Sequence, residues 1–458
     1  MRDYLPNKQF FKTFFKYALP VIIQALVLFS IGLVDTLLVS GLRNEAVSAT
    51  YAVNQLTFVF NILAQAVVMG ASIYVQQFYG AKDGKRVSES HRAKLVINFI
   101  TIAVSLLLVF VFGEQLISFF ARNDLNKPGI MDDASKYAPL IFISYIPLGF
   151  VLTYGSTFRE IRKTHYPLIA TSIALVFQTG LGYILIYPAN MGILGAAVAT
   201  IIARTVELII VLILAERVKL INLKTTFRHF VINKTLFAQI IKAGIPMFLN
   251  HMAWGIGMVV LSMSYAERAN VLSAFNVFGS ITNFFQVLYS SLAVGVVVMI
   301  GNVLGEGEIE EAKVNGKRLL FFGMAAGLVF GLILMSLSGV IPHAFEKVDP
   351  LQKQLATQLL LVYGAFLPFF VIPSVAFGAL RTGGKAKYVV IVDVISMWLY
   401  AVPIAWILIT QTNLDVIYIY LIVQLGDLVK GIIGIVLMLK VNWAVNLAEE
   451  FEQVIVET

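Results

Sequence analysis

ALPVIIQALVLFSIGLVDTLLV, residues 18–39, is the stretch of sequence that decides the fold, and Asp35 is its only charged residue. A second run without a charge, LLFFGMAAGLVFGLILMSLSGV, covers residues 319–340. A helix needs about 20 apolar residues to cross the hydrocarbon core of a bilayer. Because no water pairs with the backbone there, spanning segments are helices or closed barrels, and uninterrupted apolar runs of this length indicate helices.

The composition extends this pattern to the whole chain. Of its 458 residues, 59% are hydrophobic and 13% are charged, with a mean hydropathy of +0.85. Soluble domains contain about 25% charged residues. The apolar runs between polar loops predict about twelve spans, the first at roughly 14–39 and the seventh at roughly 243–265. We therefore expect an all-α integral membrane protein.

The sequence lacks the motifs that are typical of enzyme and metal sites. It has no cysteine, and its five histidines show no metal-ligand spacing such as HExxH. It also lacks a GxSxG motif and a P-loop. We expect no catalytic residues, no metal site and no cofactor. The N-terminal apolar run is longer than a signal-peptide core and is not followed by a small-x-small cleavage site, so we expect it to be retained as a span.

The basic residues indicate the orientation. Most of the 34 Lys and Arg residues fall in the N-terminus, in the loops that follow even-numbered spans and in the C-terminal tail. By the positive-inside rule, both termini are expected to be cytoplasmic in a multi-pass protein of the cytoplasmic membrane. The net charge of +8 is then mainly an orientation signal. The basic loops are short and lack a recognition module, so we expect no nucleic-acid partner.

The chain repeats itself at an offset of about 225 residues. Ala18-Leu19-Pro20 corresponds to Gly244-Ile245-Pro246, and Tyr79-Gly80 corresponds to Leu304-Gly305. Each half has six spans, so both halves enter the membrane in the same direction and form two pseudo-symmetric six-helix bundles. The predicted domains are an N-terminal lobe at 1–215, a cytoplasmic linker at 216–242, a C-terminal lobe at 243–440 and a cytoplasmic tail at 441–458.

Two bundles with the same orientation suit alternating access around a site near the membrane midplane. This arrangement favours a transporter of small molecules that works in the lipid bilayer as a monomer. A static scaffold and a channel are the alternatives.

The repeat contains strings that resemble one known family. They include VDTLLVSGLRNEAVSA at 34–49, VQQFYGAKD at 75–83, GAAVATIIARTVE at 195–207, IPMFLNHMAW at 245–254, IGNVLGEGEIEEAK at 300–313 and KVNWAVNLAEEF at 440–451. In order and spacing, nearly end to end, they resemble the MATE (multidrug and toxic compound extrusion) family, and most closely its branch common in Gram-positive bacteria. The resemblance implies two six-helix lobes in a V and export coupled to inward flow of H+ or Na+.

Asp35 is the strongest candidate for ion coupling. A charged carboxylate inside a span costs roughly 2.5 to 3.5 kcal/mol on insertion scales, so burial favours its protonated form. Its position matches the aspartate of the family's N-terminal lobe. Alternatively, it is a hydrated carboxylate near a helix end. Gln178 and Gly182 stand where relatives often have Asn and Asp, and Thr200 matches a family hydroxyl. One carboxylate with an amide and a hydroxyl beside it provides too few oxygen ligands for Na+, which favours H+ as the coupling ion.

The first span of the second half contains three further candidates. Many relatives read Asn-Glu where this chain has Asn250-His251, and Trp254 follows. His251 titrates near neutral pH, and Trp254 offers a ring face to flat cations. We expect these three residues to face a cleft or to take part in coupling, and ordinary packing is the alternative. Pro20 and Pro246 are the expected bends, each near the start of a half's first span.

Oppositely charged residues lie three apart, on one helix face, in the last span of each half. They are Arg204 with Glu207 and Asp427 with Lys430, and Asp393 lies at a depth within reach of Lys430. Charges so deep usually face the interior and pair. A latch within each lobe and a cytoplasmic gate or proton relay are the two interpretations.

These observations favour an exporter of amphipathic or cationic compounds, driven by H+ and less readily by Na+. The alternative within transport is a flippase for lipid-linked saccharides, which needs a strongly basic cleft for pyrophosphate. Arg204 and Lys430 are the basic residues within the predicted spans, and each has an acid nearby.

Overall fold

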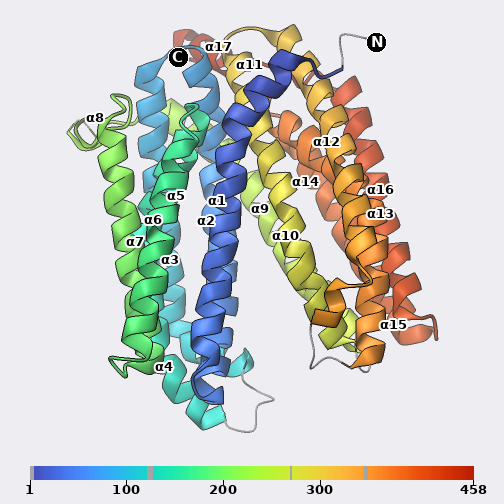
Figure 1. The fold of residues 1–458 in the computed structure, drawn as a ribbon. Coiled ribbons are helices and arrows are strands. Elements are labelled where there is room, and N and C mark those ends of the chain that lie inside the picture. The colour runs from blue at the N-terminus through green and yellow to red at the C-terminus, as the bar shows by residue number, and fades with distance from the viewer. Residues whose placement is uncertain (1–4, 121–126, 229, 269–270, 345–348, 458) are drawn as a thin grey trace. The chain divides into compact units, whose positions relative to one another are not determined.

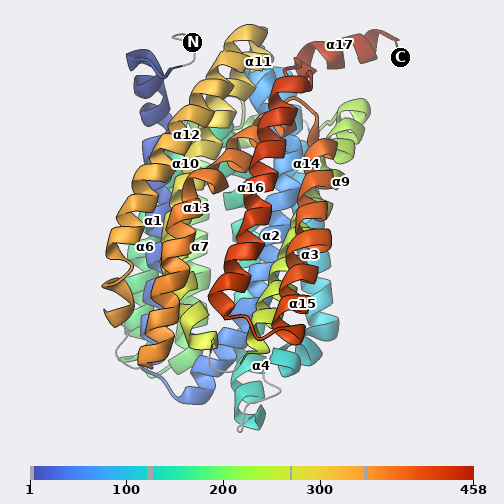
Figure 2. The same cartoon turned by 90° about the vertical axis from the view of Figure 1, so that its right-hand side faces the viewer.

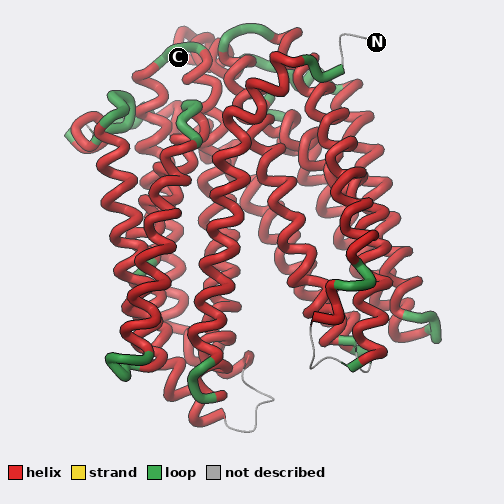
Figure 3. The backbone as a smooth tube through the Cα atoms, viewed as in Figure 1, coloured by secondary structure: helices red, strands yellow, loops and turns green. Residues whose placement is uncertain are grey.

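The computed structural model describes residues 5–120, 127–228, 230–268, 271–344 and 349–457. These residues form helices joined by short loops and contain no strand (Figure 3). The helices (Figure 1) are α1 (Lys8–Ser40), α2 (Asn44–Gly80), α3 (Gly84–Phe120), α4 (Lys127–Ile143), α5 (Tyr145–Glu160), α6 (His165–Ile186), α7 (Gly192–Glu216), α8 (Leu223–Phe227), α9 (Lys234–Ala266), α10 (Leu272–Val296), the π-helical η2 (Val297–Gly301), α11 (Asn302–Gly305), α12 (Ile309–Leu337), the 3₁₀-helical η3 (Ile341–Ala344), α13 (Pro350–Thr382), α14 (Ala386–Ile395), the π-helical η4 (Ser396–Ala401), α15 (Val402–Gln411), α16 (Val416–Lys440) and α17 (Leu447–Glu457).

Within the described residues, 12 helices are long and apolar enough to cross a membrane. This confirms the predicted all-α fold with about twelve spans. Some predicted helix ends are wrong. The seventh span was expected from residue 243, but α9 begins at Lys234. Asn233 starts it, because its Oδ1 accepts a hydrogen bond from the Leu236 amide at 3.1 Å, so the helix forms before hydropathy rises.

Contacts group the chain into two compact units. Unit 1 contains residues 1–22, 80–82 and 249–458, and unit 2 contains residues 23–79 and 83–248. The helices α1 and α9 are therefore each divided between the units. The lobe boundaries at residues 215, 242 and 440 describe chain order and stay a prediction.

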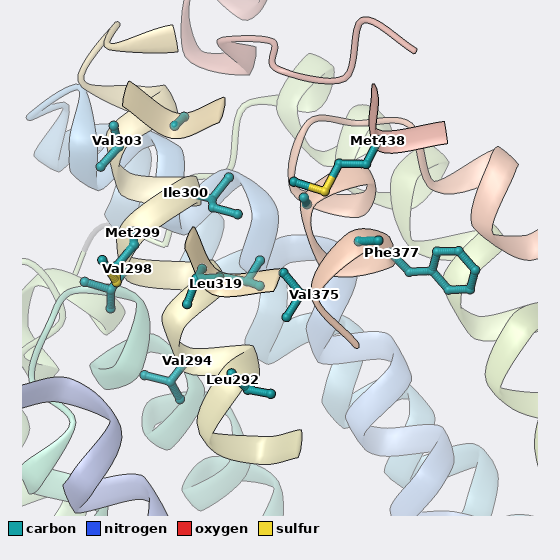
Figure 4. Packing of buried hydrophobic residues seen from close by; sticks show 14 of the residues in the cluster. Leu292, Val294, Val298, Met299, Ile300, Val303, Leu319, Val375, Phe377 and Met438 are labelled. Carbon is teal, nitrogen blue, oxygen red and sulfur yellow. The ribbon is translucent and has the colours of Figure 1, made fainter. Parts of the chain in front are cut away.

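In unit 1, the beginning of α1 belongs to the hydrophobic core. Phe10 and Phe14 are buried together with Leu292 and Leu319, and the rings of Phe14 and Phe322 meet edge to face at 4.8 Å. Figure 4 shows Leu292 and Leu319 within this cluster. Figures 1 and 2 place the start of α1 at the same end of unit 1 as α17. The first turns of the chain are thus anchored by apolar burial.

In unit 2, the beginning of α9 crosses α2 at very short range. A Cβ built on Gly70 would lie 2.5 Å from the Gly244 Cα, closer than packed atoms approach. Glycine at position 70 is therefore required by this crossing. The core of the unit forms elsewhere, where residues of α2, α4, α5 and α7 such as Val53, Tyr145 and Ile193 are buried together.

Candidate functional site

Three of the predicted coupling residues meet in unit 2. Asp35 comes from α1, Gln178 from α6 and Thr200 from α7. The Gln178 Nε2 donates to Asp35 Oδ1 and to Thr200 Oγ1, both at 2.9 Å. Gln178 is only 5% exposed, so this amide links three helices in the interior. The sequence singled out these residues separately, and the structure brings them together.

The Asp35 carboxylate has few partners among the described residues. Its Oδ1 accepts the hydrogen bond from Gln178, and no ion pair with a described Lys or Arg is present. The Thr200 hydroxyl donates its proton to the Ala196 carbonyl at 3.0 Å and so does not donate to the carboxylate. A carboxylate held by one neutral amide has an oxygen open to take up a proton.

A second polar chain in unit 2 joins the same three helices. Gln24 Nε2 donates to Thr171 Oγ1 at 3.1 Å, and Thr171 donates to Glu207 Oε1 at 2.8 Å. Arg204 completes the chain, with its Nη1 at 2.7 Å from Glu207 Oε2. The predicted pair of Arg204 and Glu207 therefore exists. Sequence reasoning missed Gln24 and Thr171, although a polar residue inside an apolar run was the available signal.

In unit 1, Asp393 on α14 is the centre of a charged cluster. Its Oδ1 lies 2.5 Å from Lys430 Nζ, and its Oδ2 lies 3.4 Å from Arg381 Nη2. The Asn250 amide on α9 donates to Oδ2 at 2.8 Å. The predicted pairing of Lys430 with Asp427 was wrong, because Asp393 on the neighbouring helix takes the ammonium. The suggestion that Lys430 reaches Asp393 was right.

A cavity of about 620 Å³ lies inside unit 1. Helices α9, α10, α13, α14 and α16 and the π-helical turn η4 contribute its wall, which includes Trp254, Asp393, Asp427 and Lys430. Asn250 contacts this wall through Asp393, whereas His251 is not among the residues that line it. Of the three candidates on α9, Trp254 is thus the one that faces the cavity directly. Their predicted part in a cleft or in coupling stays a prediction.

The turn η4 shapes this wall. The Trp398 indole donates to the Ala253 carbonyl at 3.1 Å, and the Tyr400 hydroxyl donates to the Ile422 carbonyl at 2.7 Å. These bonds tie η4 to α9 and α16. Such π-helical turns occur frequently at functional sites, and sequence reasoning did not predict this one.

Pro20 and Pro246 lie inside continuous helices, α1 and α9. Each is two residues before the point at which its helix passes from one unit to the other, after Ile22 and after Phe248. A proline removes one hydrogen bond of the helical ladder and so eases bending there. Their role as bends stays a prediction.

A buried ion pair in unit 2 escaped sequence reasoning altogether. Lys94 on α3 is fully buried, and its Nζ lies 2.7 Å from Glu160 Oε2 on α5. Ser156 and Thr157 also accept hydrogen bonds from Nζ, at 3.1 and 3.3 Å. The two residues lie on different helices and 66 positions apart in the sequence, so no local spacing pattern pointed to the pair. The described part of the chain contains no group of three or more His, Cys, Asp or Glu residues placed to hold a metal.

Comparison with known proteins agrees with this geometry. The MatE family model matches residues 20–184 and 246–407, one stretch in each half of the internal repeat. The uncharacterized transporter YisQ of Bacillus subtilis is 22% identical over 86% of this chain and 87% of its own length. A probable multidrug resistance protein NorM of Thermotoga maritima is 21% identical over 91% of this chain and 90% of its own length.

Solved structures share the fold. A MATE protein in the bent conformation has a TM-score of 0.83 at 19% identity, covering 93% of this chain and 94% of that one. A transporter of the MOP superfamily from Pyrococcus furiosus has a TM-score of 0.81 at 18% identity, with the same coverage. The relatives are transporters and not enzymes. With its two matching stretches and twelve apolar helices among the described residues, the chain belongs to the MatE family, that of the MATE multidrug efflux transporters.

Proposed function

We propose that this protein is a secondary active antiporter that exports amphipathic or cationic small molecules in exchange for H+. The observation that carries the proposal is the contact between Asp35 and Gln178, in which a buried neutral amide is the carboxylate's hydrogen-bond donor. A carboxylate without an ion-pair partner in a low-dielectric interior binds a proton readily. Release of that proton to the other side of the membrane then drives export.

The same contact favours H+ over Na+. The Gln178 amide turns its NH₂ group toward both Asp35 and Thr200. A hard cation needs several oxygen ligands, and an amide nitrogen repels it. Na+ would need the amide reversed, so that its oxygen joins the carboxylate and the hydroxyl.

The flippase alternative needs surplus positive charge for pyrophosphate. Arg204 contacts Glu207, and Lys430 and Arg381 both contact Asp393. With Asp427, which lines the same cavity as Asp393 and Lys430, these two clusters contain as many acids as bases and so have no surplus positive charge, which favours export of neutral or cationic compounds.

The charge distribution supports an orientation. The N-terminus, the loops after even-numbered spans and the C-terminal tail contain most of the basic residues, so we place both termini in the cytoplasm and the protein in the cytoplasmic membrane. In this proposal the monomer works by alternating access of its two lobes, one from each half of the repeat.

Accumulation of an organic cation in cells that lack their own exporters tests the function. The wild-type chain is expected to lower accumulation, and an ionophore that collapses the proton gradient is expected to restore it. Asp35→Asn keeps the size of the side chain and cannot carry the proton, so these cells are expected to accumulate the compound. Efflux that survives both the ionophore and the substitution would rule the proposal out.

A further inference from the structure

The cavity of unit 1 contains a carboxylate that no other described group neutralises through an ion pair or hydrogen bond. We propose that this cavity binds organic cations, with Asp427 as the anchor and Lys430 as a tethered competitor that Asp393 holds away from it. This inference rests on the proposed export function and names a site for it that is separate from the Asp35 site in unit 2.

The two carboxylates that line the cavity, Asp393 and Asp427, differ in their number of partners. Asp393 contacts three donors, namely Lys430, Arg381 and Asn250. Asp427 forms neither an ion pair nor a hydrogen bond with any residue in the described part of the chain, although Lys430 is one turn away on α16. Charges within a membrane protein usually pair. A cationic ligand is therefore the missing partner of Asp427.

The second support is the aromatic wall around this carboxylate. A ring face attracts a cation within about 6 Å of its centre, most strongly where water is excluded. The Tyr400 ring lies against Gly426, where an added Cβ would be 2.4 Å from a ring carbon, so glycine allows this ring to lie beside Asp427. The aromatic residues that line the cavity are Trp254, Tyr265, Phe275, Phe278, Tyr289, Tyr363, Phe370, Tyr400 and Tyr420.

Size and polarity agree with an organic ligand. The cavity volume of about 620 Å³ lies within the range of about 300 to 1,000 Å³ that is typical of sites for drug-sized molecules. The Tyr265 side chain lines the cavity, is 4% exposed, and its hydroxyl has no hydrogen-bond partner among the described residues. Among the described residues, no group of three or more His, Cys, Asp or Glu residues is placed to hold a metal ion, so the wall suits an organic cation better than a bare metal ion.

Lys430 gives the site a means of release. Residues three apart on a helix are neighbours on one face, so its ammonium reaches Asp427 by a change of side-chain rotamer. Asp393 now holds that ammonium at 2.5 Å. If Asp393 is neutralised, Lys430 loses its partner and turns to Asp427, where it displaces the ligand.

Binding of tetraphenylphosphonium to the purified full-length protein in detergent tests the proposal. Tetraphenylborate, which has the same shape and the opposite charge, is the matched control. We expect the wild type to bind the cation and to bind the anion at least about tenfold more weakly. Asp427→Asn is expected to weaken cation binding by about tenfold or more and to leave anion binding unchanged or stronger.

The decisive comparison leaves Asp427 intact. Asp393→Asn is expected to weaken cation binding because it frees Lys430, and the double variant with Lys430→Gln is expected to restore it. A double variant that stays weak would make Asp393 the anchor and overturn the proposal, as would wild-type affinity in Asp427→Asn. Monodispersity and thermal stability show whether each variant is folded.

The Asp35→Asn variant separates this inference from the export proposal. We expect it to bind tetraphenylphosphonium like the wild type while failing to exchange it for H+. If Asp427→Asn loses binding while Asp35→Asn still exchanges the cation for H+, the coupling role of Asp35 is wrong and the cavity proposal stands. If Asp427→Asn binds like the wild type while Asp35→Asn fails to exchange, only the cavity proposal is wrong.

Discussion

Lys430 pairs with Asp393 on another helix, at 2.5 Å, and not with Asp427 on its own helix. This choice leaves two adjacent carboxylates of unit 1 in different states, one crowded with donors and one open to the cavity. In unit 2, the comparable interior carboxylate, Asp35, is held by a neutral amide. The two units therefore place their acids in different surroundings.

Asp35→Asn is expected to abolish proton-coupled exchange while leaving the protein folded, because Asn keeps the hydrogen bond from Gln178 through its carbonyl oxygen. Drug-driven proton movement in proteoliposomes with a pH-sensitive dye measures this. Asp35→Glu, which retains a titratable group, serves as the control and is expected to keep part of the activity. Wild-type proton movement in the Asn variant contradicts a carrier role for Asp35.

Transport is expected to follow the pH gradient and to ignore Na+. The NH₂ group of Gln178 occupies the space between Asp35 and Thr200 that a cation would need. Uptake into proteoliposomes can be compared with an imposed pH gradient, with an imposed Na+ gradient and with both. If uptake tracks Na+ at constant pH, the amide is reversed and the proton assignment is wrong.

The pair of Arg204 and Glu207 predicts an asymmetry between single and double substitutions. Glu207 is 1% exposed, so Glu207→Gln leaves Arg204 without its partner in a mostly apolar interior. We expect a loss of about 1 to 3 kcal/mol in stability from the single change, and less from Glu207→Gln combined with Arg204→Gln. Thermal unfolding in detergent measures both. Near-normal transport by the double variant supports a latch, and poor transport by a stable double supports a gate.

The buried pair of Lys94 and Glu160 is expected to show a larger asymmetry, because both side chains are almost fully buried. Glu160→Gln leaves an unpaired ammonium in the interior, a change that typically costs about 3 to 5 kcal/mol. Lys94→Met combined with Glu160→Gln is expected to recover most of that loss. A double variant as unstable as the single would show that the hydrogen bonds to Ser156 and Thr157 matter more than the charges.

The crossing of α2 and α9 predicts opposite outcomes for two glycines. A Cβ on Gly70 would meet the Gly244 Cα at 2.5 Å, whereas a Cβ on Gly244 would meet the Gly70 Cα at 3.7 Å. Gly70→Ala is therefore expected to lower thermal stability, and Gly244→Ala to be tolerated. Gly32, which has open space around it, provides a helix-matched control for Gly→Ala.

The sequence predicts those features of the structure that depend on a single helix. Apolar run length gives the twelve spans, and the spacing of Arg204 and Glu207 gives their pair. Partners on different helices are harder to predict. Three-residue spacing offered Asp427 to Lys430 and similar depth offered Asp393, and the sequence could not choose between the two. Lys94 and Glu160 were missed for the related reason that their contact joins two helices, α3 and α5, and hydropathy evaluates each helix alone.

Because α1 is divided between the units, the two units cannot be completed at the same stage of synthesis. Phe10 and Phe14 are made long before Leu319 and Phe322, with which they pack. Unit 2 has all of its residues once Phe248 has been made, whereas unit 1 has to wait for the C-terminal half. The beginning of α1 can therefore be buried in unit 1 only after the residues around Leu319 and Phe322 have been made.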